Sequence, residues 1–447
     1  MITHVQNIKT QIKYSVYTNK EKIIMVKAEY MICIKICNMG GYKLSNTKVK
    51  NYIEKHWNET IKFNPNDNDT LLGLPFPYCV PSVGNFDEMY YWDTYFTDKG
   101  LAISGKMYQV RNNTCDMLYL VDKYGMMPNG NRTYFLTRSQ PPFLSFMVRD
   151  VYDYYKDVSW LKEAYTILEK EYNFWQSKRN TECGLNRYLG SVDSADYEHT
   201  ADYFEKRCGY RPDASAKDIA THMVMACESG WDVTPRWDFE GFHFAPVDLN
   251  SLLYGFEKNM EYFSFQLTNG FEDFWSKKAA YRKELMLKYM DDGTGVLLDY
   301  NYKKNSLSHI FSMASFYPLF VGLVDSCHAD AVMKRLPELE TDYGILTCAK
   351  NNVPGVYQWN YPNGWACLQY IAIMGMDKYG YKEDALRITQ KFVHLVEKVF
   401  DETNNLWEKY NVVEGNINVD NEYKMPPMMG WTAGVYLALN KYIEDSM

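Results

Sequence analysis

The chain has 447 residues, 46% of them hydrophobic, which is enough for a large buried core. Its formal net charge of −8 argues against a nucleic-acid groove or an anionic membrane surface as partner, because both attract clustered Lys and Arg. Aromatic residues are abundant, with 39 Tyr, 22 Phe and 11 Trp. They fit either an aromatic-rich core or a carbohydrate site in which rings stack on sugar faces, and composition alone favours the core.

The ten cysteines are scattered: only Cys33 and Cys37 lie within a dozen residues of each other, and no CxxC pair or Cys/His cluster follows those two. This pattern favours a reducing compartment over a disulfide framework or a zinc site. The N-terminal residues lack the apolar stretch of a signal peptide, and no apolar run is long enough to span a bilayer. We therefore predict a cytoplasmic protein without a membrane partner.

Residues 1–45 alternate apolar and polar positions, as a strand does. We expect either a small β appendage there or an extension that precedes the true domain. From residue 46 the pattern is helical, and we expect residues 46–447 to form the catalytic domain. Apolar residues recur at helical spacing most clearly over 141–155, 157–175 and 383–400.

Long connections rich in Gly, Pro, Asn and Trp separate the predicted helices. They cover residues 79–93, 124–142, 229–250 and 351–366. Long loops within a compact helical domain are uncommon and are usually functional. The pattern predicts an all-α helical toroid whose loops build a site at one end.

The predicted loops share one chemical character, in which aromatic residues are interleaved with carboxylates, amides and arginines. A sugar hydroxyl needs both a donor and an acceptor, and these side chains supply them. No Gly-rich phosphate loop or HExxH motif is present, and no GxSxG adjoins a plausible triad. The loops therefore indicate a polyhydroxylated ligand.

Two carboxylates stand out as a candidate acid and base. Asp232 follows a predicted helix end, whose partial negative charge raises a carboxyl pKa, and Trp231 and Trp237 would add desolvation. That environment suits a general acid. Glu408 follows the long helix over 383–402, and its neighbour Lys409 would favour the ionised form of a general base if it points the same way. For either residue taken alone, a solvated loop acid is the default interpretation.

Several loop motifs, taken in order, resemble the trehalase family of inverting glycoside hydrolases (glycoside hydrolase family 37). They read PNGNR-YFL-RSQPP, SGWD---RW, PVDLN, QW-YPNGWA-LQ and EKY, followed by EY and GWT-G. The resemblance covers about residues 70–440, and ordered motifs are a far more specific signal than any single one. It implies an (α/α)6 barrel and cleavage of an α-glucosidic bond with inversion, without a cofactor or a metal.

The resemblance also assigns roles to individual residues. Asp232 corresponds to the general acid, and Glu408 corresponds to the base that holds the attacking water. The remaining matched positions correspond to sugar-binding residues: Trp92, Asp93, Asn129, Arg138, Ser139, Gln140, Arg211, Asp213, Gly230, Trp359 and Glu422. The expected partner is a small carbohydrate such as a disaccharide, with no nucleic acid, and the expected state is a monomer or homodimer.

The chain departs from the family pattern at several binding positions. Asn85 stands where the first signature has Arg, Asn360 replaces the Asp of a QWD motif, and Asp213 replaces a Glu. The Gly-rich run before the later Glu is replaced by EGNINVDNEY. Losing a guanidinium that binds a sugar hydroxyl costs about 1.5–3 kcal/mol, enough to change substrate preference.

Four functional readings follow from the sequence. The leading one is hydrolysis of trehalose to two glucose molecules, and the second is hydrolysis of another α-linked disaccharide or glucosyl conjugate on the same barrel. The third is a sugar-binding protein without activity, which the presence of both Asp232 and Glu408 disfavours. A helical-barrel epimerase would need paired histidines, for which only His222 and His243 are candidates.

Overall fold

Amphipathic helices make up most of the chain that the structure describes. The computed structural model describes residues 47–419 and 425–447, and the N-terminal segment predicted over 1–45 lies outside them. In α6 (Leu144–Tyr155), α7 (Val158–Lys178) and α15 (Lys382–Thr403), the apolar residues at helical spacing are buried. These three helix predictions are confirmed.

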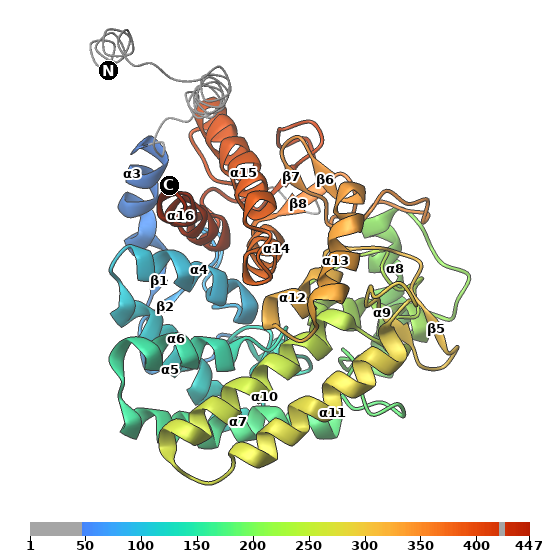
Figure 1. The fold of residues 1–447 in the computed structure, drawn as a ribbon, viewed down its shortest axis with the longest axis horizontal. Coiled ribbons are helices and arrows are strands. Elements are labelled where there is room, and N and C mark those ends of the chain that lie inside the picture. Colours follow the sequence, from blue (N-terminus) through green and yellow to red (C-terminus); the bar gives the residue numbers. More distant parts are fainter. Residues whose placement is uncertain (1–46, 420–424) are drawn as a thin grey trace, which may run out of the picture. The chain divides into compact units, whose positions relative to one another are not determined.

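The helices form a ring of inner and outer members (Figure 1). The inner helices are α4 (Tyr91–Ile103), α6, α10 (Val247–Leu267), α12 (Tyr317–Val321), α14 (Ala366–Lys378) and α16 (Gly430–Asp445). The outer helices are α3 (Thr47–His56), α5 (Met107–Tyr124), α7, α11 (Glu272–Met290), α13 (Ser326–Arg335) and α15. Neighbouring inner helices contact each other around the ring, and α4 meets α6 through a Lys99–Asp150 ion pair. This arrangement is the predicted (α/α)6 barrel.

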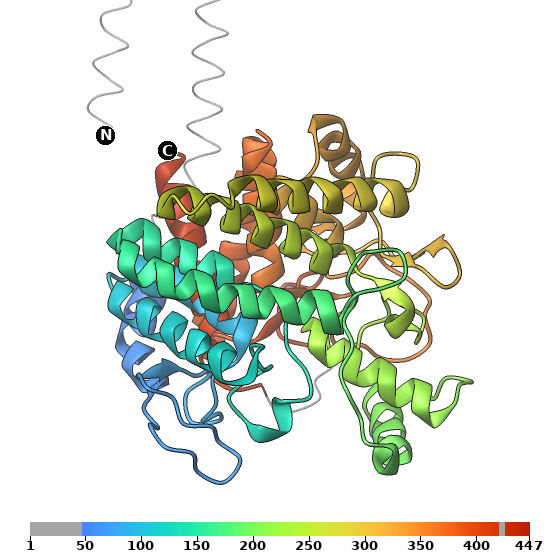
Figure 2. The same cartoon turned by 90° about the horizontal axis from the view of Figure 1, so that it is seen from below.

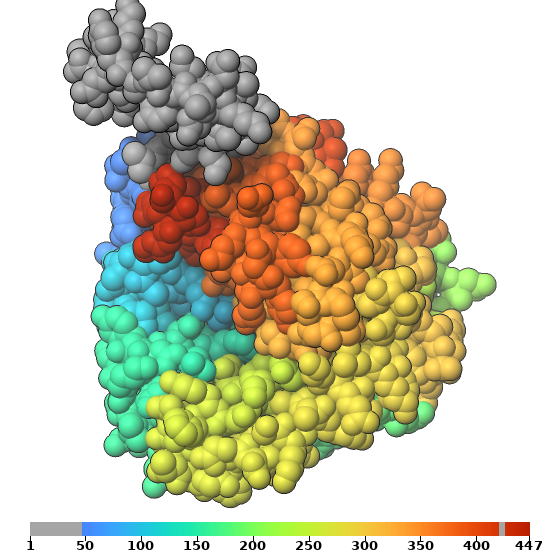
Figure 3. Space-filling model, viewed as in Figure 1, coloured from blue at the N-terminus to red at the C-terminus, as the bar shows by residue number. Residues whose placement is uncertain are grey.

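Two glycines allow α16 to pack closely against α4, and this contact completes the ring. A Cβ at Gly434 would lie 2.1 Å from the carbonyl oxygen of Phe96, and a Cβ at Gly100 would lie 2.5 Å from Gly434 Cα. The backbones therefore approach more closely than any larger side chain would allow. In the space-filling view, the red C-terminal segment accordingly lies beside the blue and cyan N-terminal part of the ring (Figure 3).

The long connections and an inserted helical hairpin lie together at one end of the ring, along the lower edge of Figure 2. The hairpin consists of α8 (Tyr197–Cys208) and α9 (Ala216–Ser229), which follow α7 and precede α10. None of the described helices is both long and apolar enough to cross a membrane.

Short antiparallel strand pairs and single 3-10 turns brace these connections. The paired strands are β1 (Ile61–Lys62) with β2 (Tyr78–Cys79), β3 (Phe244–Ala245) with β4 (Tyr300–Asn301), β4 with β5 (Ser306–Leu307), β6 (Glu340–Thr341) with β7 (Gly344–Ile345), and β8 (Asn363–Trp365) with β9 (Lys409–Asn411). The 3-10 turns are η2 (Trp57–Thr60), η3 (Thr133–Phe135), η4 (Ser194–Asp196), η5 (Gly241–His243), η6 (Met313–Phe316) and η7 (Leu336–Glu338). Pairing of β8 with β9 places the chain just before Lys409 beside the loop that carries Trp359.

Candidate active site

A cavity of about 590 Å3 lies among these connections. Nine of the predicted site residues line it, although they come from five separate parts of the chain. They are Trp92, Asp93, Asn129, Arg138, Gln140, Gly230, Asp232, Trp359 and Glu408. The fold therefore brings the proposed acid, the proposed base and most of the predicted sugar-binding groups to one place.

Three other predicted residues do not line the cavity, and Glu422 lies outside the described residues. Ser139 is fully buried and donates from Oγ to the carbonyl oxygen of Met127 at 2.6 Å, so it holds its loop in place. Arg211 points to the surface, where it pairs with the acids of α8, and Asp213 is exposed. Direct sugar contact by Arg211 and Asp213 is not supported by this placement.

The two asparagines that depart from the family pattern differ in their placement. Asn85 lines the cavity and donates from Nδ2 to the carbonyl oxygen of Val83 at 3.0 Å. Asn360 accepts a hydrogen bond from Asn351 at 2.7 Å and does not line the cavity. Of these two substitutions, only the one at position 85 changes the lining.

Arg207 and Tyr203 of α8 line the cavity but carry no motif that the sequence analysis singled out. They are four residues apart, so they share one helix face, and the guanidinium of Arg207 lies 5.5 Å from the Tyr203 ring centroid. The Arg207 guanidinium lies close enough to lower the pKa of Asp232, as does that of Arg138. The four-residue spacing of Tyr203 and Arg207 on a helix is the only signal in the sequence that could have found them. Arg211 has the same spacing from Arg207 but lies beyond the end of α8.

Gly230 ends α9 and presents the acid. Its φ of 74° is left-handed, and its N–H donates to the carbonyl oxygen of Cys227. A Cβ at this position would lie 2.7 Å from Trp92 Cε2. Val233 follows Asp232 with φ of 53°, a conformation that is rare for a β-branched residue. The backbone is thus left-handed on both sides of Asp232, which is ordinary for Gly230 at a helix end and strained for Val233.

A buried ion cluster anchors the loop that follows Asp232. Arg236 is fully buried and donates to Asp248 at 3.0 and 3.2 Å and to Asp299 at 2.9 and 3.1 Å. Its guanidinium lies 4.2 Å from the ring centroid of Trp231 and 4.5 Å from that of Trp237. These contacts tie the acid loop to the first turn of α10 and to the start of β4.

Glu228 joins the acid-bearing helix to the Arg-Ser-Gln loop. Its carboxylate is fully buried and accepts the backbone N–H of Ser139 at 2.8 Å and that of Leu189 at 2.6 Å. It also accepts two hydrogen bonds from Arg179, each at 2.7 Å. With four donors, the carboxylate fixes Arg138 and Gln140 relative to Asp232.

Burial gives two carboxyl groups of the cavity raised pKa values. Burial is the main cause for Asp93, whose pKa rises to about 8, and the nearby charges of Glu408 and Asp232 add to it. Burial also raises the pKa of Asp232, and the charge of Glu408 adds to it, while Arg207 and Arg138 oppose the rise. A carboxyl group that holds its proton in this way can act as a general acid.

Glu408 differs from these two carboxyl groups because a cation lies directly beside it. Lys409 Nζ is 2.8 Å from Glu408 Oε2, and the same ammonium donates to Gln358 at 3.2 Å. The indole N–H of Trp431 donates to the Glu408 carbonyl oxygen at 3.0 Å. Lys409 therefore points at Glu408, as the assignment of a general base requires.

Five tryptophans form the floor of the cavity. Trp359 stacks on Trp365 with centroids 3.7 Å apart, and it also stacks on Trp231 at 5.5 Å. Trp92 lies 5.6 Å from Trp359 and 6.0 Å from Trp431. Four of the five line the cavity directly, which provides apolar surface for the faces of a sugar.

The histidines needed by an epimerase do not meet in this cavity. His222 is buried in α9 and accepts the N–H of Gly241 at Nδ1, and burial lowers its pKa to about 4. Neither His222 nor His243 lines the cavity. His222 is a structural histidine, so the epimerase reading is wrong.

The barrel and its cavity, where three carboxyl groups face aromatic rings, amides and arginines, define a glycoside hydrolase. A family model described as Trehalase matches residues 18–444, and the chain belongs to the trehalase family. It is 32% identical over 420 residues to a periplasmic trehalase of Xanthomonas campestris pv. campestris (88% of this chain, 73% of the relative). It is 33% identical over 397 residues to one of Escherichia coli O1:K1 / APEC (83% and 69%). The structure of neutral trehalase Nth1 from Saccharomyces cerevisiae matches with a TM-score of 0.72 and 28% identity (86% and 76%).

These relatives overturn the prediction of a cytoplasmic protein, because their name places them in the periplasm. The prediction relied on the scattered cysteines, on the lack of a signal-peptide stretch among the N-terminal residues and on the lack of a membrane-spanning apolar run. In the described part of the chain, eight cysteines are free and four of these are buried. A buried thiol is shielded from partners and oxidants, so unpaired cysteines do not identify the compartment.

Gly230→Ala should impair both the fold and the site, because a Cβ would meet Trp92 and φ is left-handed. Gly105 has a similar φ of 71° but open space around its Cβ position, so Gly105→Ala is the matched control. We expect the control to lose about 1–2 kcal/mol of unfolding free energy with near-normal kcat/KM. Gly230→Ala should lose more stability and at least tenfold in kcat/KM, measured by urea unfolding and glucose release. Equal effects of the two substitutions would contradict the contact with Trp92.

Asp93→Asn should stabilise the protein at neutral pH while reducing activity. Asp93 has a folded-state pKa of about 8 against an ordinary value of 3.8, so its contribution to stability is full below about pH 4 and is lost as pH rises through about 8. In urea unfolding from pH 4 to 8, the free energy of unfolding of the variant should increase relative to that of the wild type as pH rises. Asp116, whose pKa burial also raises to about 8, lies outside the cavity. Asp116→Asn should show the same stability trend with unchanged kcat/KM, whereas parallel pH profiles for variant and wild type would refute the argument.

Proposed function

We propose that this protein hydrolyses α,α-trehalose to two glucose molecules with inversion at the attacked carbon. The observation that carries the proposal is that Asp232 and Glu408 line one cavity in contrasting electrostatic environments. The cavity of about 590 Å3 suits a disaccharide, and its aromatic floor suits sugar faces.

In the proposed reaction, Asp232 donates its proton to the glycosidic oxygen as the bond to the anomeric carbon breaks. Burial supports this role because it keeps the proton on the carboxyl group until the leaving oxygen accepts it. The backbone conformations at Gly230 and Val233 hold the carboxyl group in one direction. The first product is the displaced glucose, which keeps its α configuration.

Glu408 takes a proton from a water molecule as that water attacks the anomeric carbon from the opposite face. An inverting pair leaves room for this water, with the carboxyl groups about 6.5–9.5 Å apart. The ammonium of Lys409 supports the role of Glu408 by pairing with its carboxylate. The second product is β-glucose, and both carboxyl groups return to their starting states after one proton exchange with solvent.

We assign the guanidinium contacts with sugar hydroxyls to Arg138 and Arg207. Both line the cavity near Asp232, whereas Arg211 is engaged with Glu198 and Asp202 at the surface. The family pattern has Arg at the position of Asn85, so this chain lacks a cationic donor there. Arg207 supplies a cationic donor to the same cavity from α8. The amide of Asn85 favours, as a second candidate substrate, another α-linked glucoside with a different leaving group.

Variants of the two carboxyl groups distinguish their roles. Asp232→Ala and Glu408→Gln should each lower kcat on trehalose about 10²–10⁴-fold, measured by glucose release. α-Glucosyl fluoride needs no proton on its leaving group, so Asp232→Ala should keep most of its activity on the fluoride while Glu408→Gln loses it. Proton NMR of the wild type should show equal initial release of α- and β-glucose from trehalose. Near-normal trehalose turnover by either variant would remove that residue from its role.

Arg207→Gln should weaken transition-state binding, and Arg211→Gln is the matched control four residues away. Loss of a charged hydrogen-bond donor costs about 1.5–3 kcal/mol, so kcat/KM for Arg207→Gln should fall about 10–100-fold. Arg211→Gln should stay within about twofold, because its side chain lies at the surface. The opposite ranking of the two variants would return the role to Arg211.

A further inference from the structure

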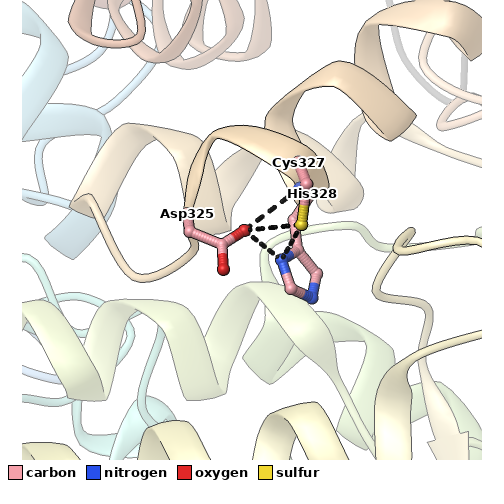
Figure 4. Close-up of side chains that lie close together, drawn as sticks. All are labelled: Asp325, Cys327 and His328. Atoms are coloured by element: carbon pink, nitrogen blue, oxygen red, sulfur yellow. Dashed lines mark hydrogen bonds and ion pairs between the residues drawn. The ribbon is translucent and has the colours of Figure 1, made fainter.

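Three side chains of different chemistry converge at the start of α13, outside the cavity that holds the acid and base (Figure 4). They are Asp325, Cys327 and His328, which offer a carboxylate oxygen, a thiol sulfur and an imidazole nitrogen. Asp325 Oδ1 lies 3.0 Å from Cys327 Sγ and 2.5 Å from His328 Nδ1, and the sulfur lies 3.6 Å from that nitrogen. Asp325 and Cys327 are exposed, so solvent reaches the group.

The spacing of these atoms fits three corners of a tetrahedral zinc site. Zinc binds sulfur at about 2.3 Å and nitrogen or oxygen at about 2.0–2.2 Å, which places tetrahedral ligand atoms about 3.3–3.7 Å apart. The sulfur to nitrogen distance already has this value, and the other two need to lengthen by less than about 1 Å. Thiolate and imidazole together select zinc over the hard cations magnesium and calcium.

A second carboxylate orients the imidazole. Asp291 Oδ2 lies 3.5 Å from His328 Nε2, on the side of the ring opposite Asp325. Asp291 is held in turn by the backbone N–H groups of Gly293 and Gly295, at 2.7 and 3.1 Å. A metal-bound histidine commonly gives its other N–H to a carboxylate in this way, which leaves the first nitrogen free to bind the ion.

The partial charge at the start of α13 repels a cation at this place, whereas the charges of the ligands attract it. The N-terminus of α13 carries partial positive charge, which repels a metal ion by a fraction of one elementary charge. Asp325 Oδ1 also caps α13 by accepting the backbone N–H of His328 at 3.3 Å. The hydrogen bond to Asp325 raises the pKa of the Cys327 thiol, so the ion must displace that proton when it binds. A thiolate and the Asp325 carboxylate supply two full negative charges in contact with the ion, so attraction exceeds the repulsion from the helix.

We propose that Asp325, Cys327 and His328 bind one zinc ion, with the fourth position open to solvent. Binding would displace the thiol proton and the proton between His328 Nδ1 and Asp325. Through Asp291, the ion would join α13 to the connection over 291–299, which ends at Asp299, a partner of Arg236. The site would therefore stabilise the fold beneath the acid loop without taking part in hydrolysis.

Cobalt titration of the full chain, freed of metal by dialysis against a chelator, tests the proposal. We expect one equivalent of Co²⁺ to give a cobalt–thiolate charge-transfer absorption, which one equivalent of Zn²⁺ abolishes. Cys327→Ser should lose the absorption and that equivalent. His328→Ala should do the same, and Asp291→Asn should weaken binding about 10–100-fold.

His309→Ala is the matched control, because His309 and Asp238 form an exposed histidine–carboxylate pair 3.2 Å apart. That variant should bind like the wild type, and trehalose turnover should be unchanged in all four variants, which shows that they fold. Absence of the thiolate absorption in the wild type would overturn the proposal. An absorption that persists undiminished in Cys327→Ser would also overturn it, because the metal would then be held by other cysteines.

Discussion

The contact of Arg236 with Asp248 and Asp299 is the interaction on which the geometry of the site depends. One cation and two anions are held together out of reach of water, and the guanidinium packs against the rings of Trp231 and Trp237. Separating any of them would leave an unpaired buried charge, which costs about 3–5 kcal/mol. The three chain segments that carry them can therefore occupy only one arrangement, and the segment that presents the acid is one of them.

Burial acts on carboxyl groups in two opposite ways within a short distance. Asp248, Asp299 and Glu228 receive arginine partners and several donors, and they serve as fixed joints between segments. Asp93 and Asp232 are partly buried in the cavity wall and have no cation in direct contact among the described ion pairs, so desolvation raises their pKa values. Desolvation thus fixes the geometry of the scaffold where charges are matched, because separating a pair would leave a buried unpaired charge, and it prepares proton transfer where they are not.

Much of the barrel and of the central pair was predictable from local signals. The apolar face of α15 follows from helical spacing, and the environment of Asp232 follows from a helix end flanked by tryptophans. The placements of Arg207 and Arg211 were not predictable, since the direction of each side chain depends on where α8 ends and on the acids of its surface. Glu228 directly precedes the SGWD motif in the sequence, yet its four donors come from segments up to 89 residues away. Such long-range contacts leave no periodic trace in a single sequence.

The tryptophan floor also makes the cavity optically distinctive. Trp359 and Trp365 lie 3.7 Å apart with an interplanar angle of 1°, and three further indoles lie within 6.0 Å of one member of the group or another. Rings at such separations exchange excitation energy and absorb ultraviolet light as a coupled set. A sugar that settles on this floor changes the polarity around several emitters at once. The protein therefore carries its own reporter of occupancy, built from the rings of the cavity floor.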